Sequence, residues 1–326
     1  TPDNAEVYRA AYTYCFIIFA GIGAQLFYNF ICAFLRSMGD SLTPLLFLLF
    51  STVLNVGLDL LFIMVFRWGV AGAAIATDIS QLVSCVLSLR FLMRVEDDYR
   101  VTAKEVRVHK KMAVRIIKVG LPTGIQNMVI SLSNVLVQVS VNGYGAAAMA
   151  GFAAYMKVDG FNILPVLSFS MAATTFVGQN FGAGKIDRVK KGTFVTLGMC
   201  IVYTILTGIL LLVFQDPIMH LFTGDETVIA YGKICMLYFC PFYWMLGILQ
   251  GLAGTVRGTG KSVPPMVVLL ISLCLFRIVW IQFALPLFAG IEGVLLVYPV
   301  SWAVGAVLMV LYAWKGKWMQ LPEAIS

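Results

Sequence analysis

An aspartate inside a long apolar run is the residue of this chain best suited to chemistry. Asp59 lies about two-thirds along the segment LLFLLFSTVLNVGLDLLFIMVF, and Asn55 precedes it by four residues. Side chains four residues apart project from the same face of a helix, so both can reach one ion. Burial in an apolar medium makes a charged carboxylate costly. The pair therefore predicts a site that exchanges a proton or another cation, and the alternative is an Asn–Asp pair that only bridges helices.

The composition indicates that these residues belong to membrane-spanning helices. Hydrophobic residues make up 60% of the 326 residues and charged residues 12%, and the mean hydropathy is +0.90. That leaves too little polar surface to cover a soluble globule. A helix needs about 20 apolar residues to cross a bilayer. We predict an all-α integral membrane protein with nine spans, centred near residues 12–35, 44–66, 70–93, 119–141, 158–178, 193–214, 230–254, 264–285 and 291–314.

The distribution of Lys and Arg predicts the orientation of these spans. If the N-terminus lies outside, most of the 23 Lys and Arg residues fall on the cytoplasmic side, as the positive-inside rule requires. They include Arg36, Arg257 and the basic residues of 185–191. The C-terminus is then cytoplasmic. The net charge of +7 reflects this topology and contact with the lipid bilayer, and no nucleic acid is expected as a partner.

The sequence offers no motif for covalent or metal chemistry. All seven cysteines fall in apolar segments, without a CxxC pair and without a histidine at metal-ligand spacing. We expect them to be small buried hydrophobic residues. No HExxH, GxSxG or P-loop string is present, and each of these would supply a specific chemistry. The chain is therefore not predicted to be an enzyme or to hold a metal centre or an organic cofactor.

An internal repeat links the two ends of the chain. The string FLRSMGDSLTP (34–44) recurs as TVRGTGKSVPP (255–265), 221 positions later. The same offset, without a gap, pairs Gly72 with Gly293 and Ser80 with Ser301. This pattern predicts a duplicated helical unit.

A polar segment between the repeats predicts how the chain is divided. RVEDDYRVTAKEVRVHKK (94–111) is the only long charged stretch, and such stretches form linkers. We expect a partial N-terminal lobe of three helices (1–93), a cytoplasmic linker (94–118) and a C-terminal lobe of six helices (119–326), the lobes being pseudo-symmetric. The first three helices match the last three, so the sequence is interpreted as a C-terminal fragment of a twelve-helix protein. A genuine nine-helix protein is the alternative.

Several strings together resemble one transporter family. They are VGQNFGAGKIDRVKKG (177–192), TVLNVGLDLLFI (52–63), GVAGAAIATDIS (69–80) and the two Arg-x-x-Gly loops of the repeat. In this order they make the chain similar to the multidrug and toxic compound extrusion (MATE) transporters over essentially its whole length. The resemblance implies two six-helix lobes around a cleft, alternating access, and a monomer in the bacterial cytoplasmic (inner) membrane. It also implies export of small organic cations or amphipathic drugs in exchange for H⁺ or Na⁺.

The resemblance also implies a cation-coupling site. Family members have Asn and Asp with the spacing of Asn55 and Asp59, a Thr at the position of Thr77, and an Asp on a first helix that this sequence lacks. Asp78 directly follows Thr77. Its side chain points about 100° away from that of Thr77, so we expect it to face another neighbour and keep it as a further candidate.

In the C-terminal lobe we expect substrate contacts rather than ion coupling. The segments 120–137 and 240–254 contain no acid, whereas some family members have coupling carboxylates there, so the chain resembles the DinF-like branch. Arg277 lies deep in an apolar run and is expected to pack the lobe, with repulsion of substrate as the alternative. Aromatic rings bind flat cations by cation–π contact, although most of them pack helices or form interfacial belts. The candidates for the substrate cleft are Asp159, Tyr155, Phe242, Tyr243 and Trp244.

The sequence thus predicts a cation-coupled multidrug antiporter, and two alternatives stay open. A flippase of lipid-linked precursors would share the two-lobe plan, but its anionic substrates favour several deep Arg or Lys residues, and only Arg277 lies deep. A membrane scaffold or an inactive fragment would make no demand on Asp59.

Overall fold

A computed structural model describes residues 5–95, 100–102, 107–315 and 318–320. In this part of the chain every regular element is a helix, and nine spans are long and apolar enough to cross a membrane. The protein is therefore an all-α, multi-pass membrane protein, as predicted. The nine spans are Tyr8–Ser37, Leu42–Val65, Gly69–Arg94, Lys110–Asn142, Ala146–Gly182, Ile186–Val213, Glu226–Gly258, Val263–Leu287 and Glu292–Lys315.

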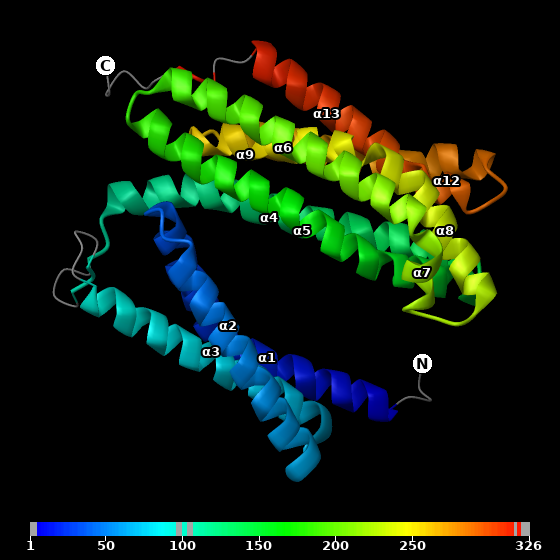
Figure 1. The fold of residues 1–326 in the computed structure, drawn as a ribbon, viewed down its shortest axis with the longest axis horizontal. Helices are drawn as coiled ribbons and strands as arrows, with labels where there is room; N and C mark the ends of the chain where they lie inside the picture. The colour runs from blue at the N-terminus through cyan, green and yellow to red at the C-terminus, as the bar shows by residue number, and fades with distance from the viewer. Residues whose placement is uncertain (1–4, 96–99, 103–106, 316–317, 321–326) are drawn as a thin grey trace. The chain divides into compact units, whose positions relative to one another are not determined.

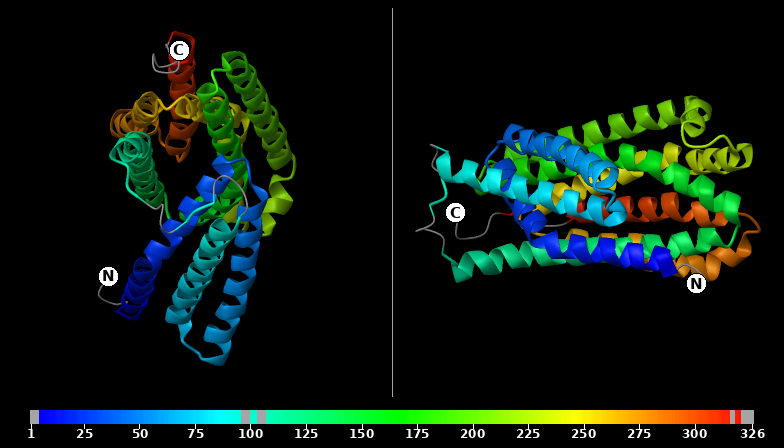
Figure 2. Two further views of the ribbon diagram at one scale, coloured as in Figure 1. Left: turned by 90° about the vertical axis from the view of Figure 1, so that its left-hand side faces the viewer. Right: turned by 90° about the horizontal axis from the view of Figure 1, so that it is seen from below.

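The chain divides into two compact units, Thr1–Val108 (unit 1) and His109–Ser326 (unit 2). In Figures 1 and 2 unit 1 is coloured blue to cyan and unit 2 cyan-green to red. The fourth span begins at Lys110, inside the segment 94–118 that the sequence suggested as linker. The reason is that KKMAVRIIK (110–118) carries few helix-breaking residues, so its charged residues extend the helix beyond the apolar run.

Unit 1 consists of α1 (Ala5–Ser37), α2 (Leu42–Leu60), the π-helical segment η2 (Leu61–Val65) that continues α2, and α3 (Gly69–Arg94). Helix α3 packs along α1 and against α2. The interior of unit 1 is small, with one buried cluster around Tyr28, Cys32 and Cys85 and a second formed by Ile31, Leu35 and Leu92. Many other apolar side chains of unit 1 are exposed, as expected for helices whose surroundings include lipid tails.

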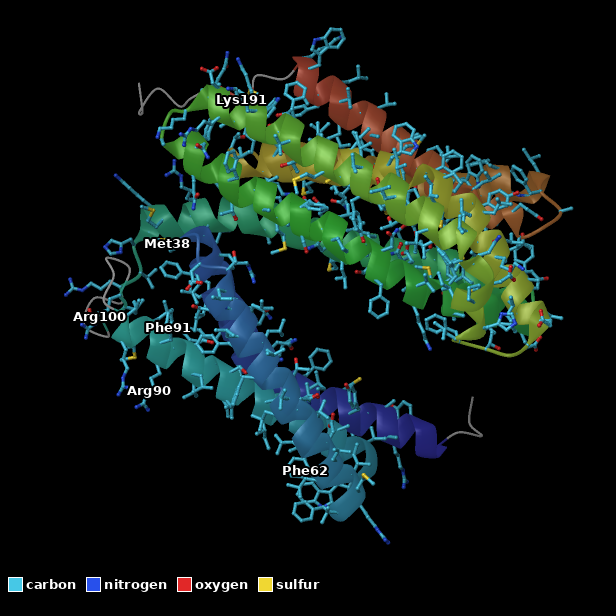
Figure 3. The ribbon with its side chains drawn as sticks, in the orientation of Figure 1. Met38, Phe62, Arg90, Phe91, Arg100 and Lys191 are labelled. Atoms are coloured by element: carbon cyan, nitrogen blue, oxygen red, sulfur yellow. The ribbon has the colours of Figure 1, made fainter. Side chains whose placement is uncertain are left out.

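An aromatic group closes the turn between α2 and α3. Phe62 stacks on Trp68 with ring centroids 5.1 Å apart and on Phe66 at 5.9 Å; Phe62 is labelled in Figure 3. Gly72 makes room for this stack, because a Cβ atom there would lie 3.0 Å from Phe62 Cβ. The aromatic rings hold the start of α3 against the end of the second span.

Unit 2 is built on long helices that run side by side in a bundle (Figures 1 and 2). Helix α5 (Ala146–Gly182) lies at its centre and packs against α6 (Ile186–Val213), α8 (Glu226–Phe239) and α9 (Tyr243–Gly258). Helix α13 (Val297–Lys315) packs on the other side of α9. The remaining elements are α4 (Lys110–Asn142), α7 (Gln215–His220), η3 (Cys240–Phe242), α10 (Val263–Leu270), η4 (Ile271–Leu275), α11 (Phe276–Val279), η5 (Trp280–Ala284), η6 (Leu285–Leu287) and α12 (Glu292–Leu295).

The predicted repeat has a structural counterpart in its turns. Gly39 and Gly260 both adopt positive φ angles, 94° and 83°, which glycine reaches without steric cost. Each ends a helix in the same way: Gly39 N–H donates to Arg36 O at 3.1 Å, and Gly260 N–H donates to Arg257 O at 2.9 Å. The conserved offset of 221 residues therefore preserves a specific turn conformation.

The repeat also extends to buried serines and to the wide helical turns. Ser80 and Ser301 both donate their hydroxyls at 2.8 Å to the carbonyl three residues earlier. The π-helical segment η2 maps onto 282–286, which overlaps η5 (Trp280–Ala284). The two units therefore share local distortions as well as a hydrophobic pattern.

Small residues let the central helices of unit 2 approach closely. A Cβ atom at Gly254 of α9 would lie 2.3 Å from Ser170 O of α5, and one at Gly258 would lie 2.8 Å from Thr174 O. The hydroxyls of Ser170 and Thr174 donate across this contact to Gln250 O at 2.7 Å and Gly254 O at 2.9 Å. Packing of small residues with hydrogen bonds across the helices is how spans associate where burial from water gives no driving force.

We expect Gly254→Ala to destabilise the protein, because its methyl group must displace backbone of α5. Overpacking of this kind costs about 1–3 kcal/mol, which a thermal melt of the detergent-solubilised protein would register as a lower Tm. Gly198→Ala is the matched control, since no atom lies within 4 Å of a Cβ there. Equal melting temperatures for the two variants would contradict the close approach of α5 and α9.

Candidate functional site

In unit 1, the structure brings together two of the residues expected to couple a cation. Asn55 of α2 donates its side-chain amide to Thr77 Oγ1 of α3 at 3.5 Å, a long and therefore weak hydrogen bond. The Thr77 hydroxyl donates in turn to Ala73 O at 3.0 Å. Because the Thr77 hydroxyl proton is donated to the Ala73 carbonyl, Thr77 Oγ1 acts toward other groups only as an acceptor. The amide oxygen of Asn55, Oδ1, is an acceptor as well.

Asp59 lies one turn further along α2, next to the start of η2. Its Oδ1 atom is buried and receives no hydrogen bond from the described part of the chain. A buried oxygen without a donor is uncommon and calls for an explanation. A carboxyl oxygen of this kind is suited to carry a proton or to coordinate a cation.

The direction of the helices decides which polar groups can share an ion with Asp59. Ser51 of α2 contacts Ser80 of α3, while Asn55 contacts Thr77, so the two helices run antiparallel. Asp59 therefore lies on the side of Thr77 that faces the start of α3. Gln81, whose Oε1 is also buried and unpartnered among the described residues, lies one turn away in the other direction. Gln81 and Asp59 thus flank the Asn55–Thr77 pair rather than sharing one coordination sphere.

Asp78 faces α1 instead of α2. A Cβ atom at Gly21 of α1 would lie 2.1 Å from Asp78 Oδ1, so the carboxylate occupies the space that this glycine leaves. The two neighbours Thr77 and Asp78 consequently point at different helices. Through its contact with Asp78, α1 borders the region of α3 that holds Thr77.

In unit 2, three of the residues expected in a substrate cleft form one hydrogen-bonded chain. Tyr243 of α9 donates its hydroxyl to Asp159 of α5, and the hydroxyls of Tyr155 and Tyr243 are hydrogen-bonded to each other. Tyr155 is 0% exposed and Tyr243 1%, so both lie in the interior of the unit. Of the other two candidates, Phe242 packs against the core and Trp244 is exposed.

Aromatic rings connect this chain of hydroxyls to a buried arginine. Tyr243 stacks on Trp302 at 5.4 Å, and Tyr155 meets Phe239 edge-on at 5.1 Å. Phe239 also contacts Tyr298 at 4.7 Å. The guanidinium carbon of Arg277 lies 4.5 Å from the centre of the Tyr298 ring.

Arg277 is held entirely by unit 2. It is 3% exposed, donates from Nη1 to Asn134 Oδ1 at 2.8 Å and from Nε to Ser301 Oγ at 3.2 Å. With the ring of Tyr298, these contacts tie α4, α11 and α13 together. This arrangement matches the packing role that the sequence suggested for Arg277.

Three buried amides were missed in the sequence analysis. Asn162 of α5 is 5% exposed and Gln126 of α4 is 3% exposed, and like Gln81 each has side-chain atoms without a partner in the described residues. The available signal was a polar amide within an apolar run. Metal-binding clusters of three or more His, Cys, Asp and Glu residues do not occur in the described part of the chain.

A small electrostatic cluster lies outside the spans, at the turn between α7 and α8. His220 donates from Nδ1 to Asp216 O at 2.8 Å, and its Nε2 lies 3.5 Å from Glu226 Oε1. The hydrogen bond to Asp216, followed by the charge of Glu226, raises the pKa of His220 above its usual value. The neighbouring Asp225 caps α8 by accepting from Thr227 N at 2.9 Å, and its hydrogen bonds from Thr227 lower the pKa of its carboxyl.

These features first define a class of protein. Helices long enough to cross a bilayer, with carboxyl, amide and hydroxyl groups gathered inside each unit, are those of a multi-pass membrane protein with ionisable residues in its spans. Such residues are expensive at membrane depth and mark ion or solute pathways.

The family follows from comparison with known sequences. A family model described as MatE matches residues 2–61 and 122–281, more than half of the chain. The chain therefore belongs to the MatE family of multidrug and toxic compound extrusion transporters, which confirms the resemblance and indicates that it is not an enzyme.

Individual relatives and structures agree with this assignment. The chain is 33% identical to "Probable multidrug resistance protein YpnP" of Bacillus subtilis over 85% of its own length and 61% of that protein. It is 28% identical to "Probable multidrug resistance protein YoeA" of the same organism over 97% of its length and 70% of that protein. A MATE transporter crystallised in the straight conformation superposes with a TM-score of 0.88 at 19% identity, over 95% of this chain and 70% of the solved chain. This last likeness shows the fold alone.

The position of Asp78 can be tested through its contact with α1. Gly21→Ala should lower the Tm, because its methyl group meets the Asp78 carboxylate, at a cost of about 1–3 kcal/mol. Adding Asp78→Ala should recover part of the loss, giving a coupling energy of about 0.5–3 kcal/mol in a double-mutant cycle. Gly23→Ala is the control, since nothing lies within 4 Å of that position. Strictly additive effects would show that Gly21 and Asp78 are not in contact.

The titration of His220 can be followed by NMR with labelled histidine. Its raised pKa means that its contact with Glu226 stabilises the fold below that pKa and is lost as the pH rises through it. Glu226→Gln should lower the pKa, because it removes the charge that favours the imidazolium. Glu292→Gln, in another turn of unit 2, should leave it unchanged. An identical titration in wild type and Glu226→Gln would refute the contact.

Proposed function

We propose that this chain acts in a cation-coupled antiporter that exports cationic or amphipathic drugs and toxins by alternating access. The observation that carries the proposal is Asp59, a carboxyl group in a membrane span whose Oδ1 is buried without a donor in the described residues. The coupling site comprises Asp59 with Asn55 and Thr77, and Asp78 belongs to its edge. H⁺ or Na⁺ is the coupling ion, and no other cofactor takes part.

The physical basis of coupling is the cost of an uncompensated charge. An ionised Asp59 in a low-dielectric span is unfavourable, so the state that shields it from water needs a bound proton or cation. Asn55 and Thr77 offer the neutral oxygen ligands that Na⁺ would use in addition to the carboxylate, since hard cations prefer oxygen. A proton needs only the carboxylate. Because the ion stabilises one state over another, its gradient drives the exchange.

The adjoining π-helical segment supports a conformational role for this site. Segment η2 begins two residues after Asp59, and π turns inside α-helices recur at functional sites. In such a turn the hydrogen-bond ladder is disrupted, so the helix is easier to bend there. Binding at Asp59 is thus positioned to influence the end of the second span.

The family and the distribution of charge support a substrate class and a location. YpnP and YoeA are named as probable multidrug resistance proteins, which supports drugs as partners of this chain. Placing the Arg36 and Arg257 loops and the basic residues of 185–191 inside gives a cytoplasmic C-terminus in a bacterial inner membrane. We take the chain to act as a monomer.

The test uses the full-length protein reconstituted in liposomes, with efflux of ethidium driven in turn by imposed H⁺ and Na⁺ gradients. Asp59→Asn should reduce gradient-driven transport by about 5- to 150-fold, the usual range of coupling between sites, and Asp59→Glu should retain a part. Asp187→Asn, an exposed residue at the start of α6, is the control and should transport normally. The gradient that drives the wild type identifies the ion.

Two results would overturn the proposal. Transport by Asp59→Asn at the wild-type rate would remove Asp59 from the mechanism. Absence of ethidium transport by the wild type, together with movement of a fluorescent lipid between leaflets, would favour a flippase; absence of both would favour a scaffold.

A further inference from the structure

Asp159 is a half-buried carboxyl group in unit 2 that has no ion-pair partner among the described residues. The salt bridges among the described residues join His220 to Glu226 and Lys233 to Asp216, and neither includes Asp159. Lys157 lies two residues earlier on α5 and is exposed, and residues two apart on a helix do not face each other. An ionised Asp159 is therefore stabilised by hydrogen bonds alone.

The hydrogen bonds of Asp159 form a chain that can run in two directions. With Asp159 ionised, Tyr243 donates to the carboxylate and Tyr155 donates to Tyr243. With Asp159 protonated, the acid can donate to the Tyr243 oxygen, and Tyr243 then donates to Tyr155. One proton added at Asp159 thus reverses every donor in the chain without breaking it.

The same face of α5 continues with an unpartnered amide. Tyr155, Asp159 and Asn162 follow at spacings of four and three residues, which places them on one face of the helix. Both side-chain polar atoms of Asn162 are buried without a partner in the part of the chain described. An orphaned amide one turn from a carboxyl group shows that this face is built for a polar exchangeable species rather than for apolar packing.

The charged and titratable groups around Asp159 come from each element packed on this region. They are Tyr155 on α5, Tyr243 on α9, Cys240 on η3, Cys235 on α8 and Tyr298 on α13. The cation of this network is Arg277, which reaches it through the ring of Tyr298. Asp159 is the carboxyl group of this set, and the other members apart from Arg277 are tyrosines and cysteines, whose ordinary pKa values lie above physiological pH.

We propose that Asp159 is a proton-binding site within unit 2, with Tyr243 and Tyr155 as the hydroxyl chain that holds the carboxyl group in both protonation states. This inference deepens the proposed function, because it gives the C-terminal lobe a proton site of its own although 120–137 and 240–254 contain no acid. Proton binding changes the bond between α5 and α9, and the stacking of Tyr243 on Trp302 carries the change to α13.

The first test measures proton binding directly, without transport. In the full-length protein in lipid, infrared spectra over a pH titration should show the carbonyl band of a protonated carboxylic acid, and Asp159→Asn should lose that component. Tyr243→Phe should shift its frequency and its titration midpoint, because one hydrogen bond to the carboxyl group is gone. Asp59→Asn and Asp187→Asn should retain it. A band unchanged in both Asp159→Asn and Tyr243→Phe would overturn the inference.

The second test separates this inference from the proposed function. If Asp159 is a coupling site, Asp159→Asn should reduce transport driven by a pH gradient at least about fivefold, and Tyr243→Phe should shift the pH profile of transport. Normal pH-driven transport by Asp159→Asn would remove Asp159 from coupling and leave the role of Asp59 intact. A titrating Asp159 in a protein that transports nothing would refute the exporter and keep the proton site.

Discussion

The structure depends on one constraint: inside a bilayer, water does not satisfy the polar groups of a protein, so each needs a partner within the chain. The backbone groups find these partners because the chain stays helical through all nine described spans. Short π and 3-10 segments interrupt the α-helix locally. Serines and threonines meet the constraint by donating to carbonyls of their own or the neighbouring helix, as Ser133 does to Leu273 O at 2.7 Å. Among the described residues, the buried side-chain atoms that do not meet it belong to Asp59, Gln81, Gln126, Asn162 and Ser262.

The two units satisfy this constraint with different chemistry at corresponding places. In unit 1 the offset of 221 residues relates Thr77 and Ser80 to Tyr298 and Ser301 of unit 2. The neighbours have diverged: Asp59 corresponds to Trp280, which donates its indole N–H to Gly293 O at 2.8 Å, and Val56 corresponds to Arg277. A shared helical frame thus holds an acidic site in one unit and a basic, aromatic interior in the other.

Much of the fold followed from the sequence because its signals are local. Continuous apolar runs give the spans, and Gly39 and Gly260 mark equivalent turns in the repeat. The candidate site of unit 1 could also be predicted from the sequence, since Asn55 and Asp59 lie four residues apart on one helix. The Asp159 chain was not, because its partner Tyr243 is 84 residues away on α9, and only tertiary packing decides that their side chains meet. The buried position of Tyr155 could not be predicted for the same reason, since an aromatic residue in a span faces lipid, a cleft or the interior with the same sequence pattern.

Each repeat contains a glycine turn and π-helical segments, and these lie at different places along its helices. The turns at Gly39 and Gly260 are short, and each is hydrogen-bonded to the end of the preceding helix. The α-helical ladder is interrupted within the spans that follow, by η2 in unit 1 and by η4 and η5 in unit 2. Since η2 adjoins Asp59, the interruption of the α-helical pattern in the second span coincides with its buried carboxyl oxygen.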